Sequence, residues 1–299
     1  MQKFTPCLWF DDQAEEAVKL YTSLFKNSKT GNIARYDSAS AEVSGRPEGS
    51  VLTVEFELEH MHFIALNGGP LFKFTPATSF FVACHSEKEI DDLWKKLSPG
   101  GMIMMELDKY PFAKKYGWLQ DKFGLSWQLF FNDGQYKQKI TPFIMFVGDK
   151  CGKVEEAIKF YTSLFKNSHT NVIVPYEKGE DPAGGTVKHA SYSLHGEQFM
   201  MMDSGYDHKF TITQAVSYMI NCQDQHEVDE LWEKLSKGGQ KQPCGWVLDK
   251  YGVAWQVVPT ILDKLLRDKN PEKAKRVMEA MLEMTKLDIK KLQDAYSKD

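Results

Sequence analysis

Hydrophobic residues recur at two different spacings along the chain, and the two spacings predict a mixed α+β fold. Ala14, Val18, Tyr21 and Phe25 recur every three or four residues, which indicates the buried face of a helix. Residues 51–58 instead alternate between apolar and polar side chains, as a strand with one buried face does. The full pattern predicts units built as a strand, a helix and three further strands.

This order of elements occurs twice, because long stretches of the sequence are repeated. The octapeptide YTSLFKNS at residues 21–28 recurs unchanged at 161–168, and GWLQDKFG at 117–124 is matched by GWVLDKYG at 245–252. About ten residues between 104 and 116 occur only in the first copy, and we expect them to form a surface loop. The predicted organisation is a first domain at 1–135, a second domain at 138–260 and a helical C-terminal extension at 261–299.

Two segments fall outside the repeated elements. The polar, Gly- and Pro-containing stretch 37–49 is expected to be an exposed, mobile loop. In the C-terminal extension, Val277, Met281, Met284 and Leu287 have helical spacing, so we expect them to be buried against the domains.

Composition narrows the class of protein. The 299 residues are 42% hydrophobic and 26% charged, with a net charge of −4 and scattered basic residues, which argues against nucleic-acid binding. No apolar run is long enough to span a bilayer, and the chain starts with a strand-like run rather than a signal peptide. Five cysteines without close pairs are typical of reduced thiols. We therefore expect a cytoplasmic protein with no membrane or nucleic-acid partner.

Three motifs together resemble a known superfamily. They are LWFDDQAEEA at residues 8–17, FIALNGG at 63–69 and GWLQDKFGLSWQ at 117–128. They resemble the vicinal oxygen chelate (glyoxalase/bleomycin resistance/dioxygenase) superfamily, and within it the PhnB-like branch, often labelled 3-demethylubiquinone methyltransferase-like, in a tandem two-domain form. The resemblance covers both copies but not the extension. It implies that each domain contains two βαβββ modules whose strands form a curved sheet, or cup.

The resemblance also implies where metal ligands would lie in relatives that bind a metal. The equivalent positions are Thr5, a residue near Thr53, Ser79 and Gln128 in the first copy, and Thr141, His189, Ser217 and Gln256 in the second. Such sites need histidine and carboxylate ligands, and only His189 qualifies, as a weak candidate. We therefore expect no cofactor and no tightly bound metal, although a divalent metal is an alternative. A methyltransferase of the dinucleotide-fold type would need a Gly-rich strand-to-helix turn, which the sequence lacks.

Strand alternation predicts which side chains line the cup that each copy is expected to form. The first cup would contain Thr5, Cys7, Trp9, Thr53, Glu55, Ser79, Phe81, Trp118, Gln128 and Phe130. The second would contain Thr141, Phe143, Met145, His189, Ser191, Ser217, Met219, Trp246 and Gln256. An aromatic lining with a few polar groups is typical of small-molecule sites, but the same residues would also suit a closed core.

The predicted function is the binding of a small, partly apolar or aromatic molecule in a cup. One alternative is an enzyme: a divalent-metal lyase, isomerase or dioxygenase using His189, or a metal-free transferase. A third class is a structural protein with vestigial cups. No catalytic residue is assigned, because no nucleophile lies in a recognisable motif with a base. The two copies are expected to pair as an intrachain pseudo-dimer, with homodimers as a further expectation.

Overall fold

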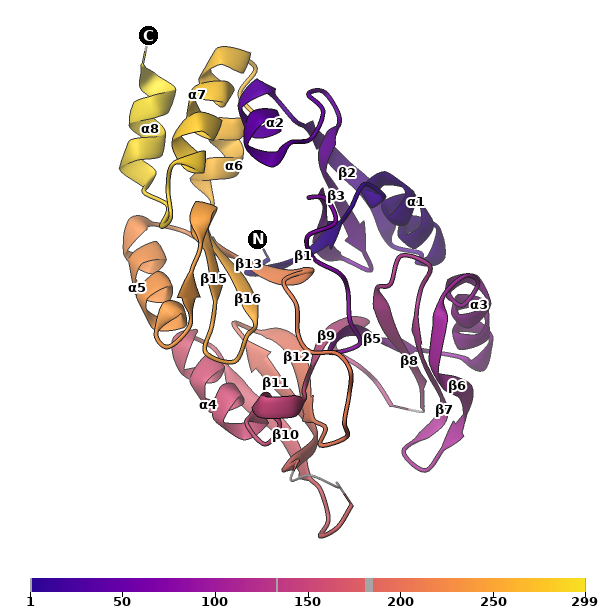
Figure 1. The fold of residues 1–299 in the computed structure, drawn as a ribbon. Helices are drawn as coiled ribbons and strands as arrows, with labels where there is room; N and C mark the ends of the chain where they lie inside the picture. The colour runs from indigo at the N-terminus through magenta and orange to yellow at the C-terminus, as the bar shows by residue number, and fades with distance from the viewer. Residues whose placement is uncertain (1, 133, 181–184, 299) are drawn as a thin grey trace. The chain divides into compact units, whose positions relative to one another are not determined.

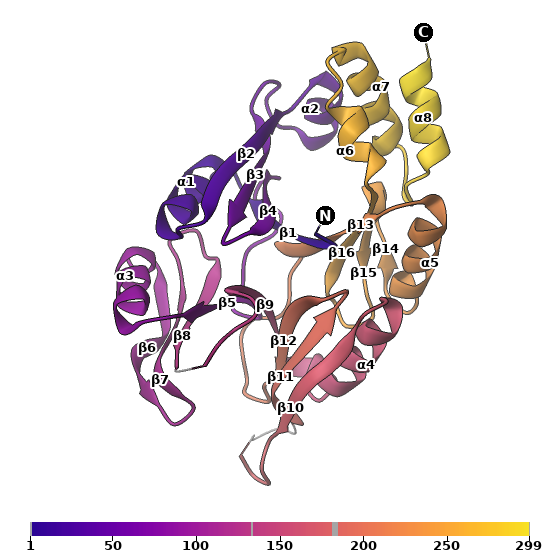
Figure 2. The ribbon, with the colours of Figure 1, turned by 180° about the vertical axis from the view of Figure 1, so that it is seen from behind.

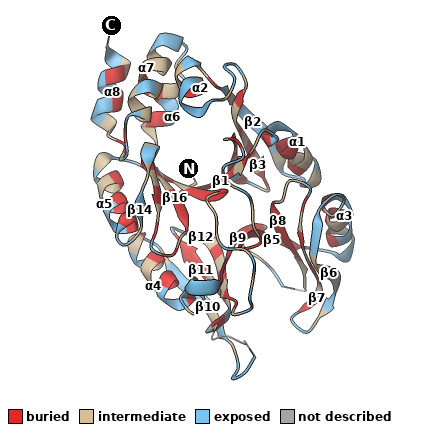
Figure 3. Cartoon of the chain, in the orientation of Figure 1, coloured by how far each residue is buried: buried red, intermediate tan, exposed pale blue. Residues whose placement is uncertain are grey.

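The computed structural model describes residues 2–132, 134–180 and 185–298, and the chain divides into two compact units. Each unit contains one curved eight-stranded sheet with helices on its outer face (Figure 1). Buried residues concentrate in the strands and on the inner sides of these helices (Figure 3). Unit 1 comprises Met1–Lys19, Lys29–Phe72 and Gln214–Asp299, and unit 2 comprises Leu20–Ser28 and Lys73–Thr213.

The sheet of unit 1 has the strand order β14-β15-β16-β13-β1-β4-β3-β2. Its centre is an antiparallel pairing of β1 with β13, in which Thr5 lies opposite Met219 and Cys7 lies opposite Ser217. The strands are β1 (Phe4–Phe10), β2 (Ser28–Arg35), β3 (Val51–Leu58), β4 (Met61–Asn67), β13 (Val216–Cys222), β14 (Gln240–Lys241), β15 (Trp246–Leu248) and β16 (Ala254–Pro259).

The sheet of unit 2 has the order β10-β11-β12-β9-β5-β8-β7-β6. Here β5 pairs with β9, so that Ser79 lies opposite Phe143 and Phe81 lies opposite Thr141. The strands are β5 (Thr78–Cys84), β6 (Met102–Tyr110), β7 (Ala113–Gln120), β8 (Ser126–Phe131), β9 (Ile140–Phe146), β10 (His169–Pro175), β11 (Val187–Leu194) and β12 (Glu197–Asp203).

These pairings confirm the predicted α+β fold of βαβββ modules with curved sheets, but they correct how the modules combine. Each sheet joins one module from the first sequence copy to one from the second. The ranges 1–135 and 138–260 therefore describe the sequence repeat, and the compact units have different boundaries. The physical reason is that β1, β5, β9 and β13 all have apolar side chains on both faces. Alternation sets the face of a strand but does not select its neighbour.

One helix accompanies each module, and Figures 1 and 2 show the helices on the outer faces of the sheets. The amphipathic helix α3 begins after Ser86, whose hydroxyl accepts a hydrogen bond from the backbone N–H of Glu89, as is typical of a serine at this position. The module helices are α1 (Ala14–Leu24), α3 (Glu87–Leu97), α4 (Val154–Leu164), preceded by the 3₁₀ turn η1 (Gly148–Lys150), and α5 (Gln225–Ser236). None of the described helices is long and apolar enough to cross a membrane.

A buried carboxylate anchors the outer side of unit 2. Asp121 accepts hydrogen bonds from the Tyr21 hydroxyl (2.7 Å) and Trp127 Nε1 (2.9 Å), and from the backbone N–H groups of Phe123 (2.9 Å) and Leu125 (3.1 Å). Burial raises the pKa of Asp121, and the four donors oppose that shift by stabilising the charged form. The repeated Trp-x-x-Asp-Lys motif is therefore structural.

Unit 1 repeats this arrangement with the second copy of the motif. Asp249 accepts hydrogen bonds from Trp255 Nε1 (2.8 Å) and from the backbone N–H groups of Tyr251 (2.8 Å) and Val253 (3.0 Å).

Two segments predicted as loops contain regular structure. Residues 38–44 form the short helix α2 (Ser38–Ser44), which begins with a capping box between Asp37 and Ser40 and ends at Gly45, whose φ is 69°. The insertion of the first copy is not a loop but a lengthened hairpin, since it extends β6 and β7. In the second copy the same place holds only β14, the 3₁₀ turn η2 (Pro243–Gly245) and β15.

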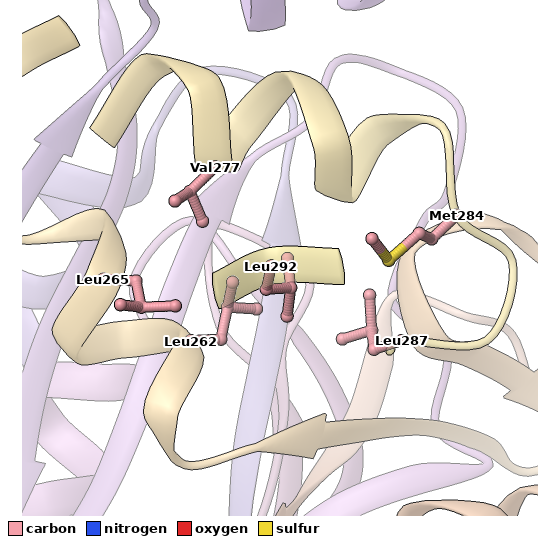
Figure 4. Close-up of a cluster of buried hydrophobic side chains, with 6 residues drawn as sticks. All are labelled: Leu262, Leu265, Val277, Met284, Leu287 and Leu292. Carbon is pink, nitrogen blue, oxygen red and sulfur yellow. The ribbon is translucent and has the colours of Figure 1, made fainter. Parts of the chain in front are cut away.

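The C-terminal extension belongs to unit 1 and has a core of its own. It forms α6 (Ile261–Leu266), α7 (Pro271–Leu282) and α8 (Ile289–Ser297). As predicted, Val277, Met284 and Leu287 are buried, while Met281 is only partly buried. They pack chiefly among themselves and against other residues of the extension rather than on the sheet. Figure 4 shows the cluster of Leu262, Leu265, Val277, Met284, Leu287 and Leu292.

Truncation after Pro259 should lower the thermal stability of unit 1. The extension docks through the backbone N–H groups of Cys244 and Gly245, which donate to Met284 O (2.7 Å) and Thr285 O (2.8 Å), and both donors would lose these partners. Calorimetry of the truncated and full chains measures the effect. An unchanged melting profile would contradict it.

Candidate ligand-binding site

The concave face of unit 1 collects predicted residues from both sequence copies. On β1, Phe4 packs against Trp255 on the helix side, so that alternation turns the intervening residues to the concave side. The predicted residues on this face are Thr5, Cys7, Trp9, Thr53, Glu55, Ser217, Met219, Trp246 and Gln256.

The concave face of unit 2 collects the others. They are Ser79, Phe81, Trp118, Gln128, Phe130, Thr141, Phe143, Met145, His189 and Ser191. Both predicted cups are therefore wrong as groupings, although the face assigned to each residue holds. Thr5 and Gln128 belong to different sheets, as do His189 and Gln256. The cause is the pairing of β1 with β13 and of β5 with β9.

A serine–glutamine pair forms the polar centre of the unit 1 face. Gln256 Nε2 donates to Ser217 Oγ at 2.9 Å. Both side chains also interact with Cys7, whose pKa is raised to about 11 because burial outweighs these hydrogen bonds. Asn221 Nδ2 donates to Thr5 Oγ1 at 3.3 Å nearby. At neutral pH this centre is uncharged, and Cys7 is a thiol rather than a nucleophilic thiolate.

The equivalent pair in unit 2 has an additional partner. Gln128 Nε2 donates to Ser79 Oγ at 2.8 Å, and Gln128 Oε1 accepts a hydrogen bond from the Tyr116 hydroxyl at 2.8 Å. Together these bonds fix the orientation of the amide. Tyr116 was missed by the sequence prediction, because it lies in the insertion that was expected to be a loop.

Three aromatic rings line one side of the unit 1 face. The ring centroids of Trp9 and Phe72 are 4.9 Å apart, and those of Trp9 and Trp246 are 6.2 Å apart, both pairs in edge-to-face geometry. Trp9 Nε1 donates to Gly69 O at 2.8 Å, which fixes the indole. Phe72 follows β4 outside any periodic element, so the alternation pattern gave no signal for it.

Apolar side chains fill the corresponding region of unit 2. Phe81, Phe143 and Met145 form a buried cluster with Ala83 and Val147. Six partly buried side chains pack against it, and two of them come from linkers between strands. The six are Trp118, Phe130, Tyr136, Met200, Met202 and Phe210.

His189 lies at the edge of this cluster, with its ring centroid 6.2 Å from that of Phe143. Burial lowers its pKa, so the imidazole is neutral at pH 7. The other positions of this face that the resemblance equates with metal ligands are Thr141, Ser79 and Gln128, which supply no carboxylate and no second imidazole. Among the described residues, no group of three or more His, Cys, Asp or Glu side chains has a metal-binding arrangement. The donor set does not fit a divalent metal.

One ion pair links the unit 1 face to the C-terminal extension. Arg267 Nη2 contacts Glu55 Oε1, and Arg267 Nε also contacts Asp263 Oδ1 at 2.5 Å. Burial raises the pKa of Glu55, while the guanidinium of Arg267 acts in the opposite direction. Arg267 was not predicted as a site residue, since the extension has no counterpart in the repeat.

Comparisons with known proteins agree with this fold. A family model described as 3-demethylubiquinone-9 3-methyltransferase matches twice, at residues 2–130 and 138–258. A putative 3-demethylubiquinone-9 3-methyltransferase, the PhnB protein of Bacillus cereus, is 44% identical over 44% of this chain and 100% of its own (TM-score 0.40). A search of curated proteins finds no significant match.

Two solved structures are similar over most of the chain. Glyoxalase I from Zea mays is 15% identical and covers 90% of this chain and 96% of its own, with a TM-score of 0.57. A putative dioxygenase from Bacillus subtilis is 10% identical and covers 99% of this chain and 96% of its own, with a TM-score of 0.51. At these identities the two likenesses show the shared fold alone.

Proposed function

Because the chain belongs to the 3-demethylubiquinone-9 3-methyltransferase family, in the tandem PhnB-like form of the vicinal oxygen chelate fold, we propose that it binds a small, partly apolar or aromatic molecule on a concave sheet face, without a tightly bound metal. The observation that carries this proposal is the serine–glutamine pair at the centre of each face. In both units an amide and a hydroxyl stand where a metal site would need charged or imidazole ligands.

The chemistry of the pairs limits the ligand. Serine and glutamine donate and accept hydrogen bonds but carry no charge, so they suit a neutral polar group such as a hydroxyl or carbonyl. The rings of Trp9, Phe72 and Trp246 in unit 1 suit a flat apolar body. The family description names a ring compound with oxygen substituents, which makes substituted methoxyphenols reasonable first probes.

A catalytic role would depend on His189, which is the alternative that the sequence offers. Its neutral imidazole could accept a proton or ligate a metal. It stands beside Phe143 on a face whose other polar positions carry no charge, which supports binding over metal-assisted catalysis. We also propose a cytoplasmic location, in keeping with five free cysteines.

We expect methoxyphenol to bind saturably in calorimetric titrations, and methylcyclohexanol, which lacks the aromatic ring, to bind more weakly. Thr53 and His189 are partly exposed side chains on the two concave faces. The double variant Thr53→Trp, His189→Trp fills both faces and should abolish saturable binding.

The matched control is Lys96→Trp combined with His226→Trp, at exposed positions of helices α3 and α5, which pack on the outer sides of the two sheets. It adds the same two indoles away from both faces and should leave binding unchanged. Equal affinity for the aromatic and the saturated probe, or full binding by the filled variant, would refute the proposal.

A further inference from the structure

The two concave faces differ in how far their equivalent residues are covered. Gln128 and Phe81 in unit 2 are only 6% and 8% exposed. Their counterparts in unit 1, Gln256 and Met219, are partly exposed. The repeat makes these positions equivalent, so that the difference reflects what lies over each sheet.

In unit 2 the concave face is covered by its own side chains and by two aromatic side chains from linkers. Met145, at the position of Trp9, is 2% exposed and belongs to the apolar cluster. Tyr136 and Phe210 add to the cluster from the linkers, with the Tyr136 ring centroid 6.4 Å from that of Phe81. The middle of this face is filled by its own side chains, and a close-packed centre leaves little room for a molecule of the proposed size, although Trp118 and Phe130 stay partly exposed.

In unit 1 the aromatic rings are partly exposed, and the C-terminal extension passes over the sheet. Three strands, β13, β1 and β4, separate β16 from β3, which is about 19 Å along a sheet with ~4.8 Å between strands. Arg267 follows β16 by only one short helix, yet it contacts Glu55 on β3. Glu55 alternates with the helix-facing residues Val54 and Phe56, so the contact lies on the concave side.

A second contact also joins the extension to the opposite half of the sheet. Helix α7 packs against α2, which connects β2 to β3, and both views of the ribbon place the two helices side by side (Figures 1 and 2). The extension is thus anchored beside β16 and reaches the opposite half of the sheet at two points. We call its part from Ile261 to Leu282 the strap.

We infer that the concave face of unit 1 is the ligand site of this protein, and that the strap closes it through the Arg267–Glu55 ion pair. This inference rests on the proposed function, and it assigns the ligand to one of two homologous faces. A ligand would lie against Trp9, Phe72 and Trp246, with its polar group at the Ser217–Gln256 pair, and would enter when the ion pair opens.

The first test separates the two filling substitutions. Thr53→Trp alone should abolish saturable binding of methoxyphenol in calorimetry, whereas His189→Trp alone should preserve it. The reverse result would assign the ligand to unit 2 and overturn the inference while supporting the proposed function. If the unsubstituted protein binds neither probe, the proposed function fails, and the strap is judged by the second test.

The second test measures the strap without any ligand, through alkylation of Cys7 followed by mass spectrometry. Cys7 lies on the concave face, whereas Cys222 lies on the helix side of the same sheet and reports wider unfolding. Glu55→Gln and Arg267→Gln should each raise the Cys7 rate about fivefold, the upper range for a partly exposed ion pair, and leave the Cys222 rate unchanged.

Asp263→Asn is the matched control, because it removes the partner of Arg267 on its own helix and keeps Glu55. Its Cys7 rate should equal that of the unsubstituted protein. Glu55→Arg alone should raise the Cys7 rate. Combining it with Arg267→Glu exchanges the two charges and should restore the protection of Cys7. Unchanged Cys7 rates in Glu55→Gln, Arg267→Gln and Glu55→Arg would overturn the strap, as would equal rises at Cys7 and Cys222.

Discussion

Replacing Asp121 by alanine should destabilise unit 2 by about 3 kcal/mol, because it leaves buried donors without an acceptor. Tyr21, Trp127 and two backbone N–H groups all donate to this carboxylate. The indole N–H of Trp127 is the most costly of these, since its ring is 1% exposed and has no other orientation. In calorimetry the transition of unit 2 should move down by roughly 6–12 °C.

Two milder substitutions rank the contributions of these hydrogen bonds to the stability of unit 2. Asp121→Asn keeps the shape but presents an NH₂ group toward one of the side-chain donors, so we expect an intermediate loss. Tyr21→Phe removes one hydrogen bond and should cost about 1 kcal/mol. If Asp121→Ala melted no lower than Tyr21→Phe, the carboxylate would not be the anchor of this helix-covered face.

Much of the fold could be predicted from local sequence. Alternation placed Thr53 and Glu55 on one face of β3, and the helical spacing of Ala14, Val18 and Tyr21 identified the inner side of α1. Side-chain burial imposes these periods directly, so that a single sequence reveals them. The N-cap of α3 was also predictable from local sequence, because Ser86 and Glu89 have the three-residue spacing of a capping box.

Strand partners could not be predicted in the same way. β5 and β9 are buried along their whole length, and such strands present no distinct face that fixes a neighbour. Their pairing places Ser79 opposite Phe143, from the other sequence copy. The wrong grouping of residues in the predicted cups follows from this pairing and from that of β1 with β13, because the individual residues were assigned to the correct faces.

Three other residues of the site could not be predicted from the sequence, each for a reason of its own. Phe72 lies in a linker, and Tyr116 lies in an insertion whose alternation is interrupted by register shifts between β6 and β7. Arg267 lies in the extension, where an arginine after an amphipathic helix is usually a solvated residue. Its contact with Glu55 depends on the curvature of the whole sheet, which no local pattern encodes.

The pairing of modules can be tested by building a metal site into unit 2. Thr141→His with Gln128→Glu would add an imidazole and a carboxylate to the face that already holds His189. These are the positions that carry ligands in metal-binding relatives of this fold, and two imidazoles with one carboxylate form a common divalent-metal site. We expect this variant to bind Zn²⁺ or Ni²⁺ stoichiometrically in calorimetry, whereas the unsubstituted protein should not.

The matched control is Thr5→His with Gln128→Glu, which follows the sequence copies instead of the sheets. It adds the same two groups, but Thr5 lies on β1 in the sheet of unit 1 and Gln128 lies on β8 in that of unit 2. The new imidazole then stands on a different sheet from His189, and only the new carboxylate joins His189 on one face. The affinity should be at least about tenfold lower, since losing even an outer-shell partner costs a metal site about 10–100-fold. Equal affinities would mean that metal binding does not depend on the β5–β9 pairing. Tight stoichiometric metal in the unsubstituted protein would refute the metal-free reading of this face.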